Sequence, residues 1–122
     1  MMVTFEEAAV MLDEIAEEIP AAFYKELNGG VYLLPEAKIS PQSKPNHPLY
    51  ILGNYNVRRD LGKYINLYYG SFEKIYSHLP PNKLRAELRR VLIHEFTHHV
   101  EFLAGEKGLI VKDAKAMAKY LG

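Results

Sequence analysis

The sequence predicts an α+β domain, in which helices pack against a small sheet of three short strands. Apolar residues recur with helical spacing near the start of the chain and again through much of its second half. Between these segments, three short runs rich in β-branched and aromatic residues occur at 31–34, 49–55 and 64–69. Helices and strands that are grouped along the chain, rather than strictly alternating, are typical of the α+β class.

Length and composition limit the functions that need to be considered. The 122 residues suit a single domain, residues 1–122, that buries an apolar core. The 15 basic and 15 acidic side chains give zero net charge, which argues against nucleic acid or an anionic membrane as a partner. We expect a cytoplasmic protein without a membrane span, because no run approaches about 20 apolar residues and no signal-peptide pattern opens the chain.

The first part of the chain is expected to be helical. Thr4 and Glu7 form a capping box, which marks the start of a helix with apolar residues at helical spacing behind it. Pro20 stops this helix, and residues 21–27 are expected to form a second, short one.

The strands follow, each bounded by turn-forming residues. The run at 31–34 is expected to be a short buried strand, and the proline-rich segment 35–48 an exposed loop. A second strand is expected at 49–55 and a third at 64–69, joined by a polar connection.

Three helices are expected in the remainder. The first covers about 71–79 and is broken by Pro80-Pro81. Asn82 then caps a long helix that extends to about Ala104, and a last helix is expected at 114–121.

The long helix carries His94-Glu95-Phe96-Thr97-His98, an H-E-x-x-H motif. Two His residues four positions apart lie one turn apart on the same face of a helix, so both imidazoles can bind one Zn²⁺. The intervening glutamate can reach a metal-activated water and act as its general base. The sequence therefore predicts one Zn²⁺ per chain, with His94 and His98 as ligands and Glu95 as the catalytic base.

A third protein ligand is needed, and since the chain has no cysteine it must be a carboxylate or another histidine. Glu101 is favoured, because it falls within about 60° of both His residues on a helical wheel, at the margin of the apolar stripe. Its position seven residues after His94 is a difficulty, so Glu106 and Asp113 remain open as ligands. In the alternative interpretation, Glu101 orients His98 instead of binding the metal.

With the motif placed, the chain resembles the small bacterial zincin-like metallopeptidases. The resemblance covers nearly the whole chain and is carried by the strings at 4–7, 26–31 and 65–72 and, most specifically, by residues 94–105. It implies a compact minimal zincin-like domain, with His94 and His98 as metal ligands and Glu95 as the base. The chain departs from larger zincins, which place a glycine and a third ligand after the second His, where this chain has Glu101 and Ala104.

Three functions remain open. The first is a zinc-dependent metallopeptidase that hydrolyses a peptide or protein substrate with a metal-activated water. The second is a metal-bearing binding or regulatory module with little or no peptidase activity, and the third is an interaction protein in which the motif is incidental. The small size predicts a shallow cleft that a partner or a homo-oligomer could complete. Tyr68 or Tyr69 could stabilise an oxyanion there, although core packing is an alternative role for both.

Overall fold

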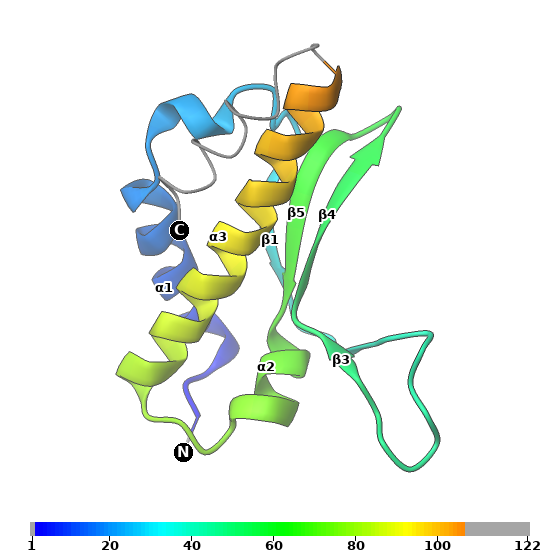
Figure 1. Ribbon diagram of the computed structural model, residues 1–122. Helices are drawn as coiled ribbons and strands as arrows, with labels where there is room; N and C mark the ends of the chain where they lie inside the picture. The colour runs from blue at the N-terminus through cyan, green and yellow to red at the C-terminus, as the bar shows by residue number, and fades with distance from the viewer. Residues whose placement is uncertain (1, 107–122) are drawn as a thin grey trace.

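The computed structural model describes residues 2–106 and has the predicted α+β architecture (Figure 1). The elements along the chain are α1 (Phe5–Glu18), the 3-10 turn η1 (Ala21–Tyr24), β1 (Gly30–Leu34), β2 (Lys38–Ile39), β3 (Tyr50–Ile51), β4 (Gly53–Arg58), β5 (Gly62–Tyr68), α2 (Tyr69–Tyr76) and α3 (Pro81–Glu106). The helix predicted at 114–121 lies outside the described residues. None of the described helices is long and apolar enough to cross a membrane.

The main sheet has three strands in the order β1-β5-β4. β5 lies at the centre, parallel to β1 and antiparallel to β4. Alternation along β5 places Ile65 and Leu67 in the core, where both are fully buried. On β1, Tyr32 is half exposed and lies on the opposite face. Since β4 comes last in the strand order β1-β5-β4, it is an edge strand of the described sheet.

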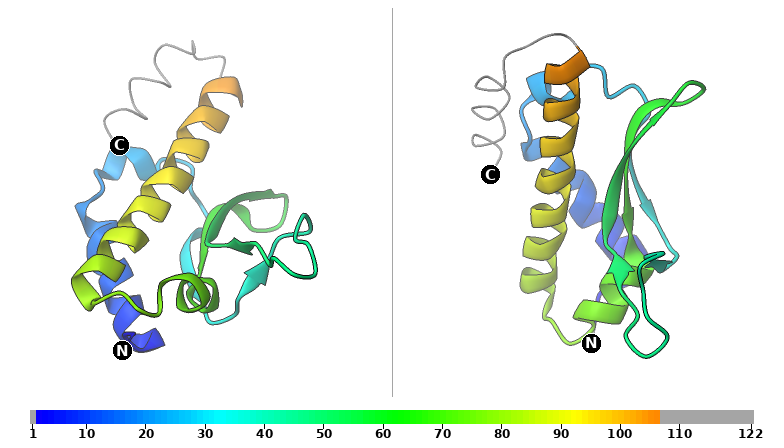
Figure 2. Two further views of the ribbon diagram at one scale, coloured as in Figure 1. Left: turned by 60° about the horizontal axis from the view of Figure 1, so that its bottom comes forward. Right: turned by 45° about the vertical axis from the view of Figure 1, so that its right-hand side comes forward.

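The predicted strand 49–55 is divided into two. Tyr50 and Ile51 pair with Lys38–Ile39 as the separate two-stranded sheet β2–β3, and β4 begins at Gly53. The segment 35–48 is therefore not only a loop, since it contributes β2. The two strands contact α2, and Figure 2 shows the loop between them projecting away from the rest of the molecule.

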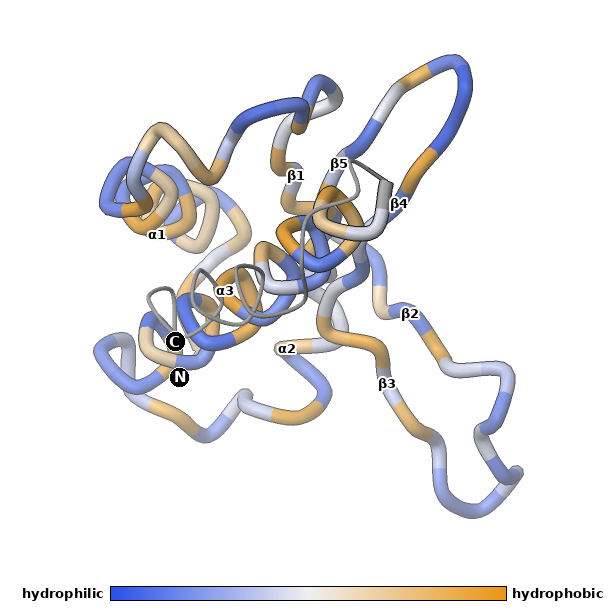
Figure 3. The backbone as a smooth tube through the Cα atoms, turned by 45° about the horizontal axis from the view of Figure 1, so that its top comes forward, coloured by the Kyte–Doolittle hydropathy of each residue, from blue (hydrophilic) through white to orange (hydrophobic). Residues whose placement is uncertain are grey.

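The core lies between the helices and one face of the sheet. Figures 1 and 2 show α1 and α3 on the same side of the sheet, with α3 beside β4 and β5. The interior is closed by apolar side chains that are fully buried, among them Ile15, Ile65, Leu92 and Phe96. Along α3 the backbone is alternately hydrophobic and hydrophilic, as expected of a helix buried on one side (Figure 3).

The helix starts follow local chemistry, with small differences from the predictions. The capping box is confirmed: the Glu7 amide donates to the Thr4 hydroxyl at 3.1 Å, and the Thr4 amide donates to the Glu7 carboxylate at 2.8 Å. The segment predicted as a helix at 21–27 is a 3-10 turn of four residues. α2 begins at Tyr69 rather than at residue 71, so Tyr69 belongs to the helix and not to the preceding strand.

Candidate metal and peptide site

The motif residues lie at the edge of the buried face of α3. Leu92 and Phe96 are fully buried and fix the orientation of the helix against the core. His94 and His98 are exposed, whereas Glu95 is 5% exposed. The predicted position of the two His residues at the margin of the apolar stripe is therefore confirmed.

The two imidazoles meet through the nitrogens that would bind a metal. The Nε2 atoms of His94 and His98 are 3.0 Å apart, and the ring planes are close to perpendicular, at 85°. Two nitrogens bound to one tetrahedral zinc at about 2.0–2.1 Å lie about 3.3 Å apart. The pair therefore fits two neighbouring positions on a zinc ion after a shift of a few tenths of an ångström.

The electrostatics of His94 favour its role as a ligand. Partial burial is the largest cause that lowers the pKa of His94, and the neighbouring His98 and Arg90 act in the same direction, while Glu101 opposes them. A lower pKa keeps the imidazole neutral, and the neutral ring is the form that binds a metal.

Glu95 has the environment expected of a general base. Burial raises the pKa of Glu95, and the nearby His98 offsets part of this effect. A carboxylate with a raised pKa is a stronger base and takes up a proton more readily. Glu95 lines the same cleft as the two His residues.

The predicted third ligand does not join the two His residues. Among residues 2–106, no group of three His, Cys, Asp or Glu side chains is close enough to hold a metal ion. Glu101 lines the cleft but is exposed, and it lies about 10 Å beyond His94 along the helix axis, which explains the difference. Asp113 lies outside the described residues, as does the side chain of Glu106, so the identity of the third ligand stays a prediction.

Zinc affinity is expected to separate these candidates. The measurement compares Glu101→Ala, Glu106→Ala and Asp113→Ala with the wild type by competition against a zinc-binding dye. Removing a ligand is expected to weaken binding beyond the 10–100-fold that is typical of residues that only orient a ligand. Unchanged affinity in Glu101→Ala would exclude Glu101 both as a ligand and as a residue that orients His98.

A cleft of about 720 Å³ runs along α3 beside the edge strand β4. It is lined by Ile51, Gly53, Asn54, Tyr55, His94, Glu95, His98, Glu101 and Phe102. Gly53 allows this close approach of strand and helix, because a Cβ atom there would lie 2.9 Å from Val91 and 3.0 Å from the Asn66 carbonyl oxygen. The cleft thus places a strand edge directly opposite the motif.

The cleft tyrosine is not one of the two that the sequence suggested. The Tyr69 hydroxyl donates to the Val3 carbonyl oxygen at 2.6 Å, and Tyr68 is buried and accepts a hydrogen bond from Asn54 at 3.1 Å. Tyr55 on β4 lines the cleft instead.

His99, which the sequence analysis did not select, connects the cleft wall to the core. Its ring is fully buried, with Nε2 2.8 Å from the Lys25 carbonyl oxygen and Nδ1 2.7 Å from the Tyr55 hydroxyl. Because a carbonyl can only accept, Nε2 carries the proton, and in the neutral ring Nδ1 accepts from Tyr55. A helical wheel contains the signal for this burial, since His99 falls at about 60° from Leu84, inside the apolar stripe.

Replacing His99 by alanine is expected to destabilise the fold by about 2–5 kcal/mol. The substitution leaves a cavity and removes the partners of the Lys25 carbonyl and the Tyr55 hydroxyl. Denaturant unfolding of the metal-free protein measures this effect. Tyr55→Phe, which removes only the hydroxyl, is the matched control and is expected to cost less. A His99→Ala protein as stable as the wild type would mean that this buried network contributes nothing to stability.

Comparison with known proteins gives a match among the solved structures. No protein-family model and no curated protein matches the chain. A solved structure does match it, that of a conserved hypothetical protein from Thermus thermophilus, with a TM-score of 0.72 and 33% sequence identity. The match covers 84% of this chain and 99% of that chain.

These findings contradict the predicted membership in the small bacterial zincin-like metallopeptidases. No model of that family matches the chain, and the solved structure it resembles carries a name that states no activity. The described part of the chain also lacks the three-ligand metal group that such a protein would present. The function must therefore be argued from the side chains of this site.

Proposed function

We propose that this chain, which belongs to the same family as the conserved hypothetical protein from Thermus thermophilus, is a zinc-dependent hydrolase of peptide bonds. The observation that carries the proposal is the 3.0 Å separation of the His94 and His98 Nε2 atoms, with Glu95 in the same cleft. Neither His residue has a buried apolar environment to explain its presence, since both side chains are exposed. In this structure the two Nε2 atoms are within hydrogen-bond distance of each other, and a metal ion bound to both would replace that contact.

The side chains of the cleft have distinct roles in this reaction. His94 and His98 hold the metal, and Zn²⁺ when bound supplies a Lewis acid that acidifies water and polarises a carbonyl group. Glu95 accepts the proton of the attacking water and delivers it to the leaving amine. β4 lies at an edge of the sheet among the described strands, and its outer edge offers main-chain donors and acceptors to an extended peptide, which would lie beside the motif.

A second candidate is a metal-bearing binding module with little or no peptidase activity. It is supported by the open shape of the cleft and by the finding that no third metal-ligating side chain joins the two His residues among the side chains that the structure describes. A site with two protein ligands leaves more of the metal to water or to a bound partner. Such a module would capture a peptide without cutting it.

Metal analysis and peptide turnover test both candidates together. Protein purified without chelator or added metal is expected to contain about one Zn²⁺ per chain. The zinc-loaded protein is then incubated with a library of random peptides, and new termini are identified by mass spectrometry. Cleavage supports the hydrolase, and zinc binding without cleavage supports the binding module. Protein that holds no zinc, even when zinc is supplied, would contradict both.

A further inference from the structure

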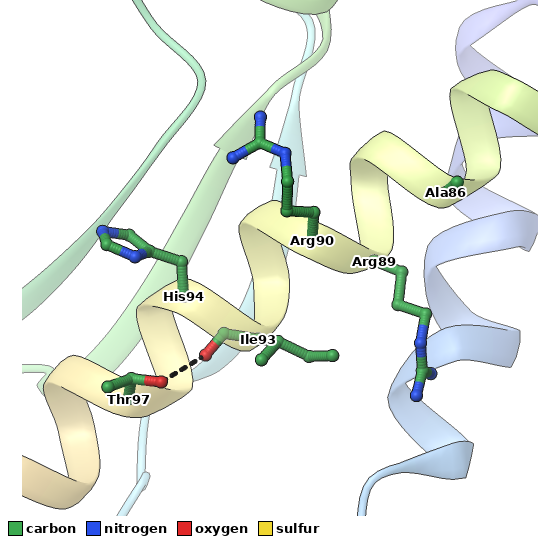
Figure 4. A pocket seen from close by; sticks show the side chains of 6 residues that line it. All are labelled: Ala86, Arg89, Arg90, Ile93, His94 and Thr97. Atoms are coloured by element: carbon green, nitrogen blue, oxygen red, sulfur yellow. Dashed lines mark hydrogen bonds between the residues drawn. The ribbon is translucent and has the colours of Figure 1, made fainter. Parts of the chain in front are cut away.

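The N-terminal end of the cleft carries a positively charged group that the proposed hydrolysis does not use. Arg90 lies one turn before His94, and Figure 4 shows both side chains projecting from the same side of α3. A smaller pocket of about 250 Å³ is lined by Arg90 together with His94, Glu95 and residues 50–53. The guanidinium is therefore part of the same surface as the motif.

We propose that Arg90 binds the C-terminal carboxylate of a short peptide, so that the site acts close to the C-terminus of its substrate. This inference rests on the proposed function, because it assigns the substrate class of that site. An arginine guanidinium recognises a carboxylate through paired N–H donors, which makes it the side chain best suited to this role.

Arg90 has donors available for such a ligand. Its Nε donates to Glu87 at 2.8 Å, and its Nη2 donates weakly to the Tyr76 hydroxyl at 3.4 Å. A guanidinium has five N–H donors, so three are left by these two contacts. The ion pair with Glu87 holds the guanidinium in place and offsets part of its charge, and 57% of the Arg90 side chain is exposed.

The neighbouring arginines have other roles. Arg85 pairs with Glu14 at 2.7 Å, and Arg89 pairs with Glu18 at 3.2 Å, so both tie α3 to α1. Figure 4 shows Arg89 projecting from α3 in a different direction from Arg90 and His94. Arg90 is also paired, to Glu87 on its own helix, but unlike the other two it lines the pocket that contains His94 and Glu95, and Arg89 provides a matched control.

The charges along the cleft fix the direction of the peptide. Arg90 lies at one end of the motif and Glu101 at the other, so a carboxylate is favoured near Arg90 and an ammonium group near Glu101. β4 runs in the same direction as α3, since Gly53 lies near Arg90 and the later Tyr55 lies near His99. A peptide with its C-terminus at Arg90 is thus antiparallel to β4.

The spacing sets where the cleaved bond falls. Four residues of helix separate Arg90 from His94, which is about 6 Å along the axis. An extended peptide advances about 3.3 Å per residue. The cleaved bond therefore lies within about two residues of the C-terminal carboxylate.

The test compares random pentapeptides made as free acids with the same pentapeptides made as C-terminal amides. Zinc-loaded wild type is expected to cleave the free acids with a kcat/KM about 10–100-fold higher, as for loss of a hydrogen bond to a charged group. Arg90→Gln is expected to lose this preference by slowing only the free acids, with its zinc content unchanged. Arg89→Gln is expected to keep the wild-type preference.

A binding measurement separates this inference from the proposed hydrolysis. Equilibrium dialysis of both libraries against zinc-loaded Glu95→Gln is expected to retain the free acids over the amides, and the added Arg90→Gln change is expected to remove the difference. This preference without any wild-type cleavage would support the Arg90 inference and contradict the hydrolase. If free acids and amides are cleaved and bound equally well, the Arg90 inference is overturned while the proposed hydrolysis still stands. The inference would also be overturned if, within the amide library, the protein preferred peptides with internal Asp or Glu and Arg90→Gln removed that preference. It would equally be overturned if the protein bound neither library.

Discussion

Replacing Glu95 by glutamine is expected to reduce kcat for peptide hydrolysis about 10²–10⁴-fold, while zinc content and fold are retained. Glutamine has nearly the same shape as glutamate but cannot accept the proton of the attacking water. The Glu95 side chain is buried in the cleft beside both His residues, and because glutamine fills the same space without a charge to bury, we expect the loss to be chemical rather than structural.

The measurement is the cleavage rate of one peptide selected from the random library, with zinc content determined on the same samples. Glu73→Gln is the matched control, because Glu73 is exposed on α2 and does not line the cleft. Its rate is expected to equal that of the wild type. If Glu95→Gln cleaves the peptide as fast as the wild type, Glu95 is not the general base.

The sequence predicted the parts of the fold that depend on local patterns. Apolar periodicity located α1 and α3, and the capping box at Thr4 marked the first helix start. The pairing of β2 with β3 was missed, because Lys38 and Ile39 come within a proline-rich segment and their partners lie 13 and 11 residues away, respectively. Strand pairing between distant residues leaves little trace in local composition.

The candidate site likewise combines positions set by local helix geometry with positions set by tertiary packing. The spacing of His94, Glu95 and His98 lies within one helix, so their relative positions follow from helix geometry alone. The cleft wall depends on β4, which reaches the motif through tertiary packing, and no spacing rule connects Tyr55 with His99 across 44 positions. The identity of the third ligand stays a prediction for the same reason, since a ligand from outside the helix would be placed by tertiary structure.

Replacing both His94 and His98 by alanine is expected to remove most of the bound zinc. Both side chains are exposed, so the metal-free fold is expected to lose little stability. Zinc that binds only the folded state stabilises it by about 2.7 kcal/mol at a concentration of 100 times its Kd. For a domain of this size such a difference corresponds to a Tm shift on the order of 10 °C. This shift is expected in the wild type and is expected to be absent from the double variant.

Thermal unfolding with added zinc and with a chelator measures this shift directly. His78→Ala is the matched control, because His78 is exposed and lies outside the cleft. That variant is expected to keep both the zinc content and the zinc-dependent Tm of the wild type. A double variant that keeps its full zinc content would show that the metal binds elsewhere. If the double variant loses its zinc but the wild-type Tm is the same with zinc and with chelator, zinc binds the folded and the unfolded chain equally. The two imidazoles would then not form a site that depends on the fold.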